Sequence, residues 1–267
     1  MISICIKSYK KHSFEILEEK LGTLTIPKIY YLQKRFKYSN NLIIHYTGKC
    51  TRAFFASISS VIADYIIENY EESFLQKNLD YEYFYFSNSE KKHIKDAAQV
   101  FLHNALHFEE KKFAISTSIQ NYFVENKILE IDGFINFRLY AYRNILNTAI
   151  EKATNEFVIQ KEYSEYVNLL KDYINLQPPQ TECIHLVYAN DNKLLLDNEN
   201  NVITNTSDSQ IYLSDISFSS NDFVLNSLLT LLPQKIYIHL IDKEDNFIEF
   251  LKLIFAGRYS ICDSNVF

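Results

Sequence analysis

One arginine and one glutamate stand among apolar side chains in two consecutive helical segments. In INFRLYAYRN, residues 135–144, Arg138 lies beside the apolar stripe, whereas Arg143 falls on the polar side. Glu162 lies within the apolar stripe of the next segment. A guanidinium group binds carboxylates and phosphates through paired hydrogen bonds. This pattern predicts either a buried ion pair or a pocket in which Arg138 holds an anionic ligand.

The two helical segments, residues 131–156 and 158–176, are separated by a short connection. Such a connection folds consecutive helices back on each other as an antiparallel pair. We expect Arg138 and Glu162 to meet across that interface, because each charge would be costly to bury alone. Removing one partner of a buried ion pair destabilises a protein by about 3–5 kcal/mol.

Two cysteines and two histidines near the C-terminus have the chemistry of metal ligands. Cys183 and His185 share one face of a predicted strand, and His239 and Cys262 lie in strands that could neighbour it. Zinc ligands, however, usually come from closely spaced residues on tight loops. We therefore expect packed sheet residues here, without a metal or any other cofactor.

The net charge of −6 is distributed unevenly along the chain. Residues 1–60 hold ten lysines and arginines against three acids, while residues 181–267 hold five against twelve. In KRFKYSNN, Lys34, Arg35 and Lys37 are mixed with aromatic side chains, as in proteins that bind single-stranded nucleic acids. The same mixture fits a solvated edge hairpin whose lysines prevent strand pairing between molecules. We favour the hairpin and keep nucleic-acid binding as the alternative.

The composition excludes several common catalytic sites. The four glycines are isolated, so no dinucleotide-binding or P-loop sequence is present, and G-x-S-x-G and H-E-x-x-H are absent as well. The four cysteines are far apart, which is typical of reduced thiols and indicates a cytoplasmic protein. The most apolar helical run is interrupted by Asp64 and is too short for a membrane span, so we expect no membrane partner.

An α+β fold with three regions is predicted to position these residues. Residues 1–50 form a small β element, and residues 51–178 form an all-helical region that ends at Pro178 and Pro179. Residues 181–267 form a compact α/β module with a mixed sheet.

Local signals predict the individual elements within these regions. In the β element, a turn at Asn40-Asn41 joins two strands. The expected helices of the middle region cover residues 53–78, 87–106, 110–127, 131–156 and 158–176. The module is expected to contain strands over 183–189, 193–197, 201–205, 235–241 and 258–262, and helices over 222–232 and 246–257. Ser87 with Glu90 and Ser219 with Asp222 have the spacing of helix-capping boxes. The last strand–helix–strand unit is expected to be parallel, with Gly257 ending its helix.

Two pairs of sequence segments resemble one protein family. GFINFRL at residues 133–139, followed by EFVIQKEYSEYVNLLKDYI at 156–174, resembles the YtxC-like sporulation proteins of endospore-forming Firmicutes. LLTLLPQKIYIHLI and FIEFLKLIFAGRYSIC are similar to that family's C-terminal segment. The resemblance implies an intracellular protein associated with sporulation, without an established activity or catalytic residues. It marks four positions whose role is unknown: Phe137, Arg138, Glu162 and Tyr163.

The sequence therefore predicts a cytoplasmic, sporulation-associated protein that acts by interaction or regulation rather than by catalysis. Its protein partner is not identified by any residue pattern. One alternative is a nucleic-acid-binding protein that uses the basic first 60 residues. Another is an enzyme of unrecognised class that binds an anion through Arg138.

Overall fold

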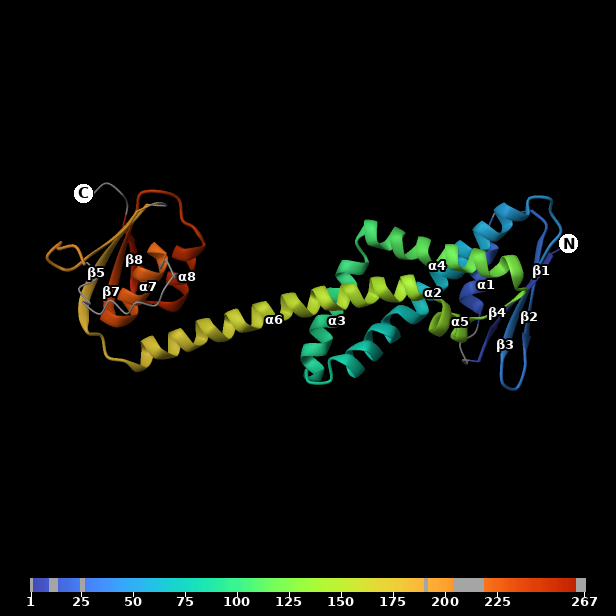
Figure 1. Ribbon diagram of the computed structural model, residues 1–267, viewed down its shortest axis with the longest axis horizontal. Helices are drawn as coiled ribbons and strands as arrows, with labels where there is room; N and C mark the ends of the chain where they lie inside the picture. The colour runs from blue at the N-terminus through green and yellow to red at the C-terminus, as the bar shows by residue number, and fades with distance from the viewer. Residues whose placement is uncertain (1, 10–13, 25–26, 190–191, 204–218, 263–267) are drawn as a thin grey trace, which may run out of the picture. The chain divides into compact units, whose positions relative to one another are not determined.

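The computed structural model describes residues 2–9, 14–24, 27–189, 192–203 and 219–262. The chain divides into two compact units, Met1–Val158 and Ile159–Phe267 (Figure 1). Each unit combines a four-stranded sheet with helices, so the predicted α+β fold class is confirmed. The predicted regions 1–50, 51–178 and 181–267 differ from this division, since the first sheet and the helices after it share one core.

The sheet of the first unit is built from four short strands. They are β1 (Ile2–Ser8), β2 (Ile29–Arg35), β3 (Asn40–Tyr46) and β4 (Ile128–Glu130). Their order is β2-β3-β1-β4, in which β4 is parallel to β1 and the other pairs are antiparallel. Alternate residues of β1 and β3, such as Ile4 and Leu42, are buried, so one face of the sheet packs on the helices.

Six helices contribute to the first unit within the described residues (Figure 1). They are α1 (Glu15–Gly22), α2 (Thr51–Glu82), α3 (Asn88–Leu102), α4 (Ala105–Glu125), α5 (Ile131–Arg138) and the first half of α6 (Tyr140–Leu176). The capping box of Ser87 and Glu90 at the start of α3 is confirmed. Helix α3 ends four residues before its predicted end at 106, because Asn104 caps the next helix through the Leu106 N–H.

The hairpin between β2 and β3 turns earlier than predicted. The Phe36 N–H donates a hydrogen bond to the Ser39 carbonyl over 2.8 Å, so the turn covers residues 36–39. The predicted turn at Asn40-Asn41 is wrong, since both asparagines pair with β2 as residues of β3. Lys37 and Tyr38 occupy the exposed centre of the turn.

The long helix α6 continues through the residues that were predicted to turn. Residues 156–158 contain no glycine or proline, and nothing in their backbone ends the helix. The predicted antiparallel pair of helices over 131–156 and 158–176 is therefore wrong. The break occurs earlier, at Leu139, whose φ of −94° and ψ of 51° separate α5 from α6.

The second unit has a mixed sheet, as predicted. Its strands are β5 (Thr181–Tyr188), β6 (Lys193–Leu196), β7 (Pro233–Leu240) and β8 (Tyr259–Cys262), in the order β6-β5-β7-β8. Strands β5, β7 and β8 are parallel, and β6 is antiparallel to β5. Of the strand predicted over 201–205, residues 201–203 form one bridge, between Val202 and Leu196, and residues 204 and 205 lie outside the described residues.

The described part of the second unit also contains two helices, α7 (Ser220–Leu231) and α8 (Asn246–Ile254), which pack in one core with the end of α6. The capping box of Ser219 and Asp222 at the start of α7 is confirmed. Gly257 follows α8 with a φ of +82°, a conformation that glycine adopts without strain. Across the described part of the chain, no helix combines the length and the apolar character that crossing a membrane requires.

Candidate functional site

Arg138 lies on the surface of the first unit, at the junction between α5 and α6. It is the last residue of α5, and its side chain is exposed. Its guanidinium carbon lies 5.7 Å from the centre of the Tyr122 ring. The predicted burial of Arg138 is wrong, because the break at Leu139 ends the helical phase on which that prediction depended.

Arg143, on the first turn of α6, makes a similar contact with an aromatic ring. Its guanidinium carbon lies 5.1 Å from the centre of the Tyr140 ring. Tyr140 is 63% exposed and Phe137 is 70% exposed. In the part of the chain that the structure describes, neither arginine forms an ion pair with a carboxylate. We call Tyr122, Phe137, Arg138, Tyr140 and Arg143 the arginine–aromatic surface.

Glu162 and Tyr163 lie in the second unit, on the second half of α6. Both side chains are exposed, and the Tyr163 ring lies 6.4 Å from the ring of Phe250 on α8. Because Arg138 and Glu162 are both exposed, the predicted buried ion pair between them is wrong. All four positions marked by the sequence resemblance are surface residues.

A buried ion pair does exist in the first unit, at two residues that the sequence interpretation missed. Lys111 of α4 is fully buried and Glu71 of α2 is 3% exposed. The Lys111 Nζ donates to both Glu71 carboxylate oxygens, over 2.9 and 2.7 Å. The hydroxyl of Tyr142 on α6 also donates to Glu71, over 3.3 Å. Burial and the Glu71 charge raise the pKa of Tyr142, so this hydroxyl keeps its proton.

The signal for this pair is present in the sequence at helical spacing. Glu71 stands four residues from both Ile67 and Leu75, and all three lie on the buried face of α2. Lys111 stands four residues before the buried Ile115 in the same way on α4. A search for charged residues on every apolar stripe would have found both.

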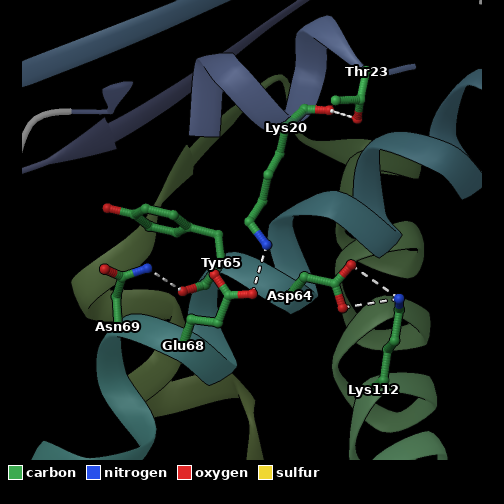
Figure 2. Close-up of polar contacts among 7 residues, drawn as sticks. All are labelled: Lys20, Thr23, Asp64, Tyr65, Glu68, Asn69 and Lys112. Carbon is green, nitrogen blue, oxygen red and sulfur yellow. Dashed lines mark hydrogen bonds and ion pairs between the residues drawn. The ribbon is translucent and has the colours of Figure 1, made fainter. Parts of the chain in front are cut away.

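Further acids on α2 are paired with lysines from the surrounding helices. Lys20 of α1 lies 2.6 Å from Glu68, and Lys112 of α4 lies 2.8 Å from Asp64. Figure 2 shows both pairs. Two more pairs join α3 to α2: Lys95 with Glu72 and Lys91 with Asp80. The lysines of these pairs are buried or half-buried, whereas three of the four acids are more than half exposed. Pairs that remain open to solvent contribute about 0–1 kcal/mol each, so they orient the helices more than they stabilise them. They also occupy lysines that would otherwise be available for binding.

The hairpin β2–β3 carries the predicted basic residues. Lys34 and Arg35 end β2, and the Lys37 ammonium lies 5.1 Å from the centre of the Tyr38 ring. Aromatic side chains are exposed beside them on the same hairpin: Tyr30, Tyr31, Phe36 and Tyr38. Among the described residues, one of the three basic groups has a carboxylate partner, because Arg35 pairs with Glu15 over 3.0 Å. The hairpin is thus a basic and aromatic edge of the first sheet.

The second sheet brings together part of the predicted cysteine and histidine set. The Nδ1 of His185 and the Nε2 of His239 are 2.9 Å apart, and Cys262 stands opposite His239 in the strand register. Cys183 contacts Asn198 instead, with 3.0 Å between Sγ and Oδ1. Burial and the neighbouring His185 lower the pKa of His239. Among the residues described, no three His, Cys, Asp or Glu side chains form a group that could hold a metal ion.

A cavity of about 270 Å³ lies between α2 and α5 in the first unit. Asp132 lines it and accepts hydrogen bonds from the Ser8 hydroxyl over 3.0 Å and the Tyr9 N–H over 3.3 Å. The charged groups of the lining are Asp132 and Lys77, and Arg138 is not part of it. The arginine therefore belongs to an open surface and not to this cavity.

Comparison with known proteins assigns the chain to a family. The profile of the YtxC-like family matches residues 56–260, which include the arginine–aromatic surface and exclude the hairpin β2–β3. The chain is 28% identical over 78 residues to a protein of Bacillus subtilis (strain 168) named "Uncharacterized protein YtxC", and the match spans 29% of this chain and 28% of that protein. No solved structure matches the chain significantly. Because the profile covers more than half of the residues, the chain belongs to the YtxC-like family.

Proposed function

We propose that this chain is a non-enzymatic interaction protein of sporulation that binds an acidic segment of a partner protein through the arginine–aromatic surface. The observation that supports this proposal is the environment of Arg138. Its side chain is exposed, lies on the Tyr122 ring and has no carboxylate partner among the described residues. The connection with sporulation rests on the resemblance of the chain to proteins of spore formers.

The chemistry of the surface supports a carboxylate-bearing partner. A guanidinium that lies on an aromatic ring keeps its in-plane N–H groups available, and these match the two oxygens of a carboxylate. Arg138 and Arg143 provide two such groups within six residues. Tyrosine and arginine are also among the side chains that contribute most often to the energy of protein interfaces.

The test is affinity capture from sporulating cells with the full chain as bait. Partners held by the wild type should be lost with Arg138→Ala/Arg143→Ala and weakened with Arg138→Lys/Arg143→Lys, since lysine keeps the charge but not the planar donor pair. Arg52→Ala is the matched control, because Arg52 is an exposed arginine on the first turn of α2. Capture that is unchanged by the double alanine variant would refute the proposed surface.

A second candidate function is binding of single-stranded nucleic acid by the hairpin β2–β3. The observation in its favour is that Tyr30, Phe36 and Tyr38 are exposed beside Lys34 and Lys37. Exposed rings stack on bases, and adjacent cations neutralise phosphates.

Fluorescence anisotropy with a labelled single-stranded oligonucleotide tests this candidate. If the hairpin binds the oligonucleotide, Lys34→Ala/Arg35→Ala/Lys37→Ala should weaken binding. The number of neutralised phosphates, obtained from the slope of the binding constant against salt concentration on logarithmic scales, should fall by about three. Lys77→Ala, an exposed lysine of α2, serves as the control. In the capture experiment, nuclease treatment should release the partners only if this candidate is correct.

A further inference from the structure

The second half of α6, residues 159–176, leaves one apolar stripe exposed. The stripe consists of Ile159, Glu162, Tyr166, Leu169, Tyr173 and Leu176, and every member is exposed. Leu169 is 68% exposed and Leu176 is 83% exposed. Isolated apolar side chains on a surface are ordinary, but five on one helix face form a continuous strip that the described residues do not cover.

The stripe is separate from the contacts that anchor α6 in the second unit. Val167, Leu170 and Ile174 of the same segment pack into the core of that unit. At 3.6 residues per turn, the centre of the stripe lies roughly 100° around the helix axis from these three residues. Of the stripe members, only Tyr166 makes a ring contact with another described residue of the unit, Phe250 of α8. The described residues of the second unit thus leave most of the stripe exposed.

The spacing of the stripe identifies the shape of its partner. Its members follow one another at intervals of three, four, three, four and three residues. This alternation is the seam of a coiled coil, in which side chains of one helix insert between those of another. A second helix with the same spacing is the partner that fits such a seam.

Glu162 determines which helix fits. In a parallel pair of two copies, the carboxylate would face its own copy, and the like charges would repel. In an antiparallel pair centred between Val167 and Asn168, Glu162 faces the partner's Tyr173, whose hydroxyl can donate a hydrogen bond to it. The same arrangement places Tyr166 against the partner's Leu169. The stripe is therefore complementary to itself in the antiparallel direction.

We propose that two copies of this chain associate through the Ile159–Leu176 stripe of α6 as an antiparallel helix pair. The exposed side chains of two stripes would bury roughly 1,000 Å² in total, which reaches the lower limit for a specific interface. An interface of this size is typical of a reversible association between the two copies. It uses the second unit and leaves the arginine–aromatic surface of the first unit outside the seam.

Sedimentation equilibrium of the full chain over a wide range of concentration tests the association. The wild type should pass from monomer to dimer, and Leu169→Glu should shift the midpoint to at least tenfold higher concentration. Val100→Glu is the matched control, because Val100 is an equally exposed apolar residue on α3. A wild type that stays monomeric throughout, or a Leu169→Glu variant that dimerises like the control, would overturn the proposal.

Disulfide trapping tests the orientation of the two helices. An equimolar mixture of Tyr166→Cys and Leu169→Cys chains should form an intermolecular disulfide between positions 166 and 169, identified by peptide mass mapping. The Leu169→Cys chain alone should not be linked through position 169. Efficient linkage of position 169 to itself would indicate parallel helices and contradict the antiparallel pair.

Discussion

The two halves of α6 have similar apolar periodicity but opposite surroundings. In the first half, Tyr142, Leu146 and Ala149 are buried in the core of the first unit. In the second half, the residues from 159 to 166 are exposed on every side of the helix. Periodicity shows that a helix face is apolar, but it does not show that the same chain covers that face. The comparison suggests experiments in which the buried residues of the first half should respond strongly and the exposed residues of the second half weakly.

The largest effect is expected at the buried ion pair of Lys111 and Glu71, which the first half of α6 contacts through the Tyr142 hydroxyl. Lys111→Met should reduce the free energy of unfolding by about 3–5 kcal/mol, because it leaves Glu71 buried without its partner. Urea unfolding of the full chain, followed by circular dichroism, measures the change. Lys112→Met, at the neighbouring and partly exposed pair with Asp64, should cost at most about 1 kcal/mol. Equal losses in the two variants would contradict the assignment.

The next largest effect comes from matched leucine substitutions in the two halves. Leu146→Ala should destabilise the first unit by about 2–5 kcal/mol, because Leu146 is fully buried. Leu169→Ala should change the stability of the monomer by no more than about 0.5 kcal/mol. Hydrogen exchange at low protein concentration reports both changes segment by segment. A strong loss of protection with Leu169→Ala would show that the stripe is covered within one chain.

A smaller, pH-dependent effect is expected at the start of α8, where Asp245 caps the helix and accepts a hydrogen bond from Tyr188 of β5. Burial raises the pKa of Asp245, but the Tyr188 hydroxyl and the Ile248 and Phe247 N–H groups outweigh it, and the net pKa is lowered. Asp245 therefore adds stability above its ordinary pKa of 3.8, and this contribution is lost as the pH falls through the lowered value.

Tyr188→Phe removes one of these donors and should cost about 1–2 kcal/mol near neutral pH. The difference between the variant and the wild type should shrink once the pH falls below 3.8, since the carboxyl is then protonated in the unfolded chain. Unfolding free energies measured across this range give the profile. A difference that does not depend on pH would assign the effect of Tyr188→Phe to packing alone.

The smallest effect is expected in the exposed stretch of α6. Gln160→Gly should weaken the helix locally by about 0.7–1 kcal/mol, because Gln160 is exposed and glycine has greater backbone freedom in the unfolded chain. Faster hydrogen exchange of the amides around 159–166 is the measurement, and Gln160→Ala should leave their exchange unchanged. Unaltered protection in the glycine variant would mean that this stretch is held by contacts beyond its own helix.

Elements with strong local signals were predictable from the sequence. The capping boxes of Ser87 and Ser219 begin α3 and α7 as predicted, since each is decided by residues three positions apart. The parallel pairing of β7 with β8 was also predicted, because a short strand–helix–strand unit has few alternatives.

Elements that depend on distant contacts were missed. Strand β4 has only three residues and exists through its pairing with β1, so its own sequence gives no signal. The turn predicted at residues 156–158 of α6 was wrong, because these residues include no glycine or proline that would end a helix. The candidate site shows the same limit. The sequence singles out Arg138 as a charged residue beside an apolar stripe, but its exposure depends on the helix break at Leu139, which the sequence did not reveal.

The pairing of β1 with β4 also governs the order in which the first unit can be completed during synthesis. Leu129 follows its partner Ile6 by 123 residues, which a ribosome adds in roughly 6–25 s. Strands β1, β2 and β3 can pair within the first 46 residues, so one side of β1 waits with its backbone groups unpaired until β4 emerges. For this interval the nascent chain has an open edge that a chaperone or a neighbouring nascent chain could occupy.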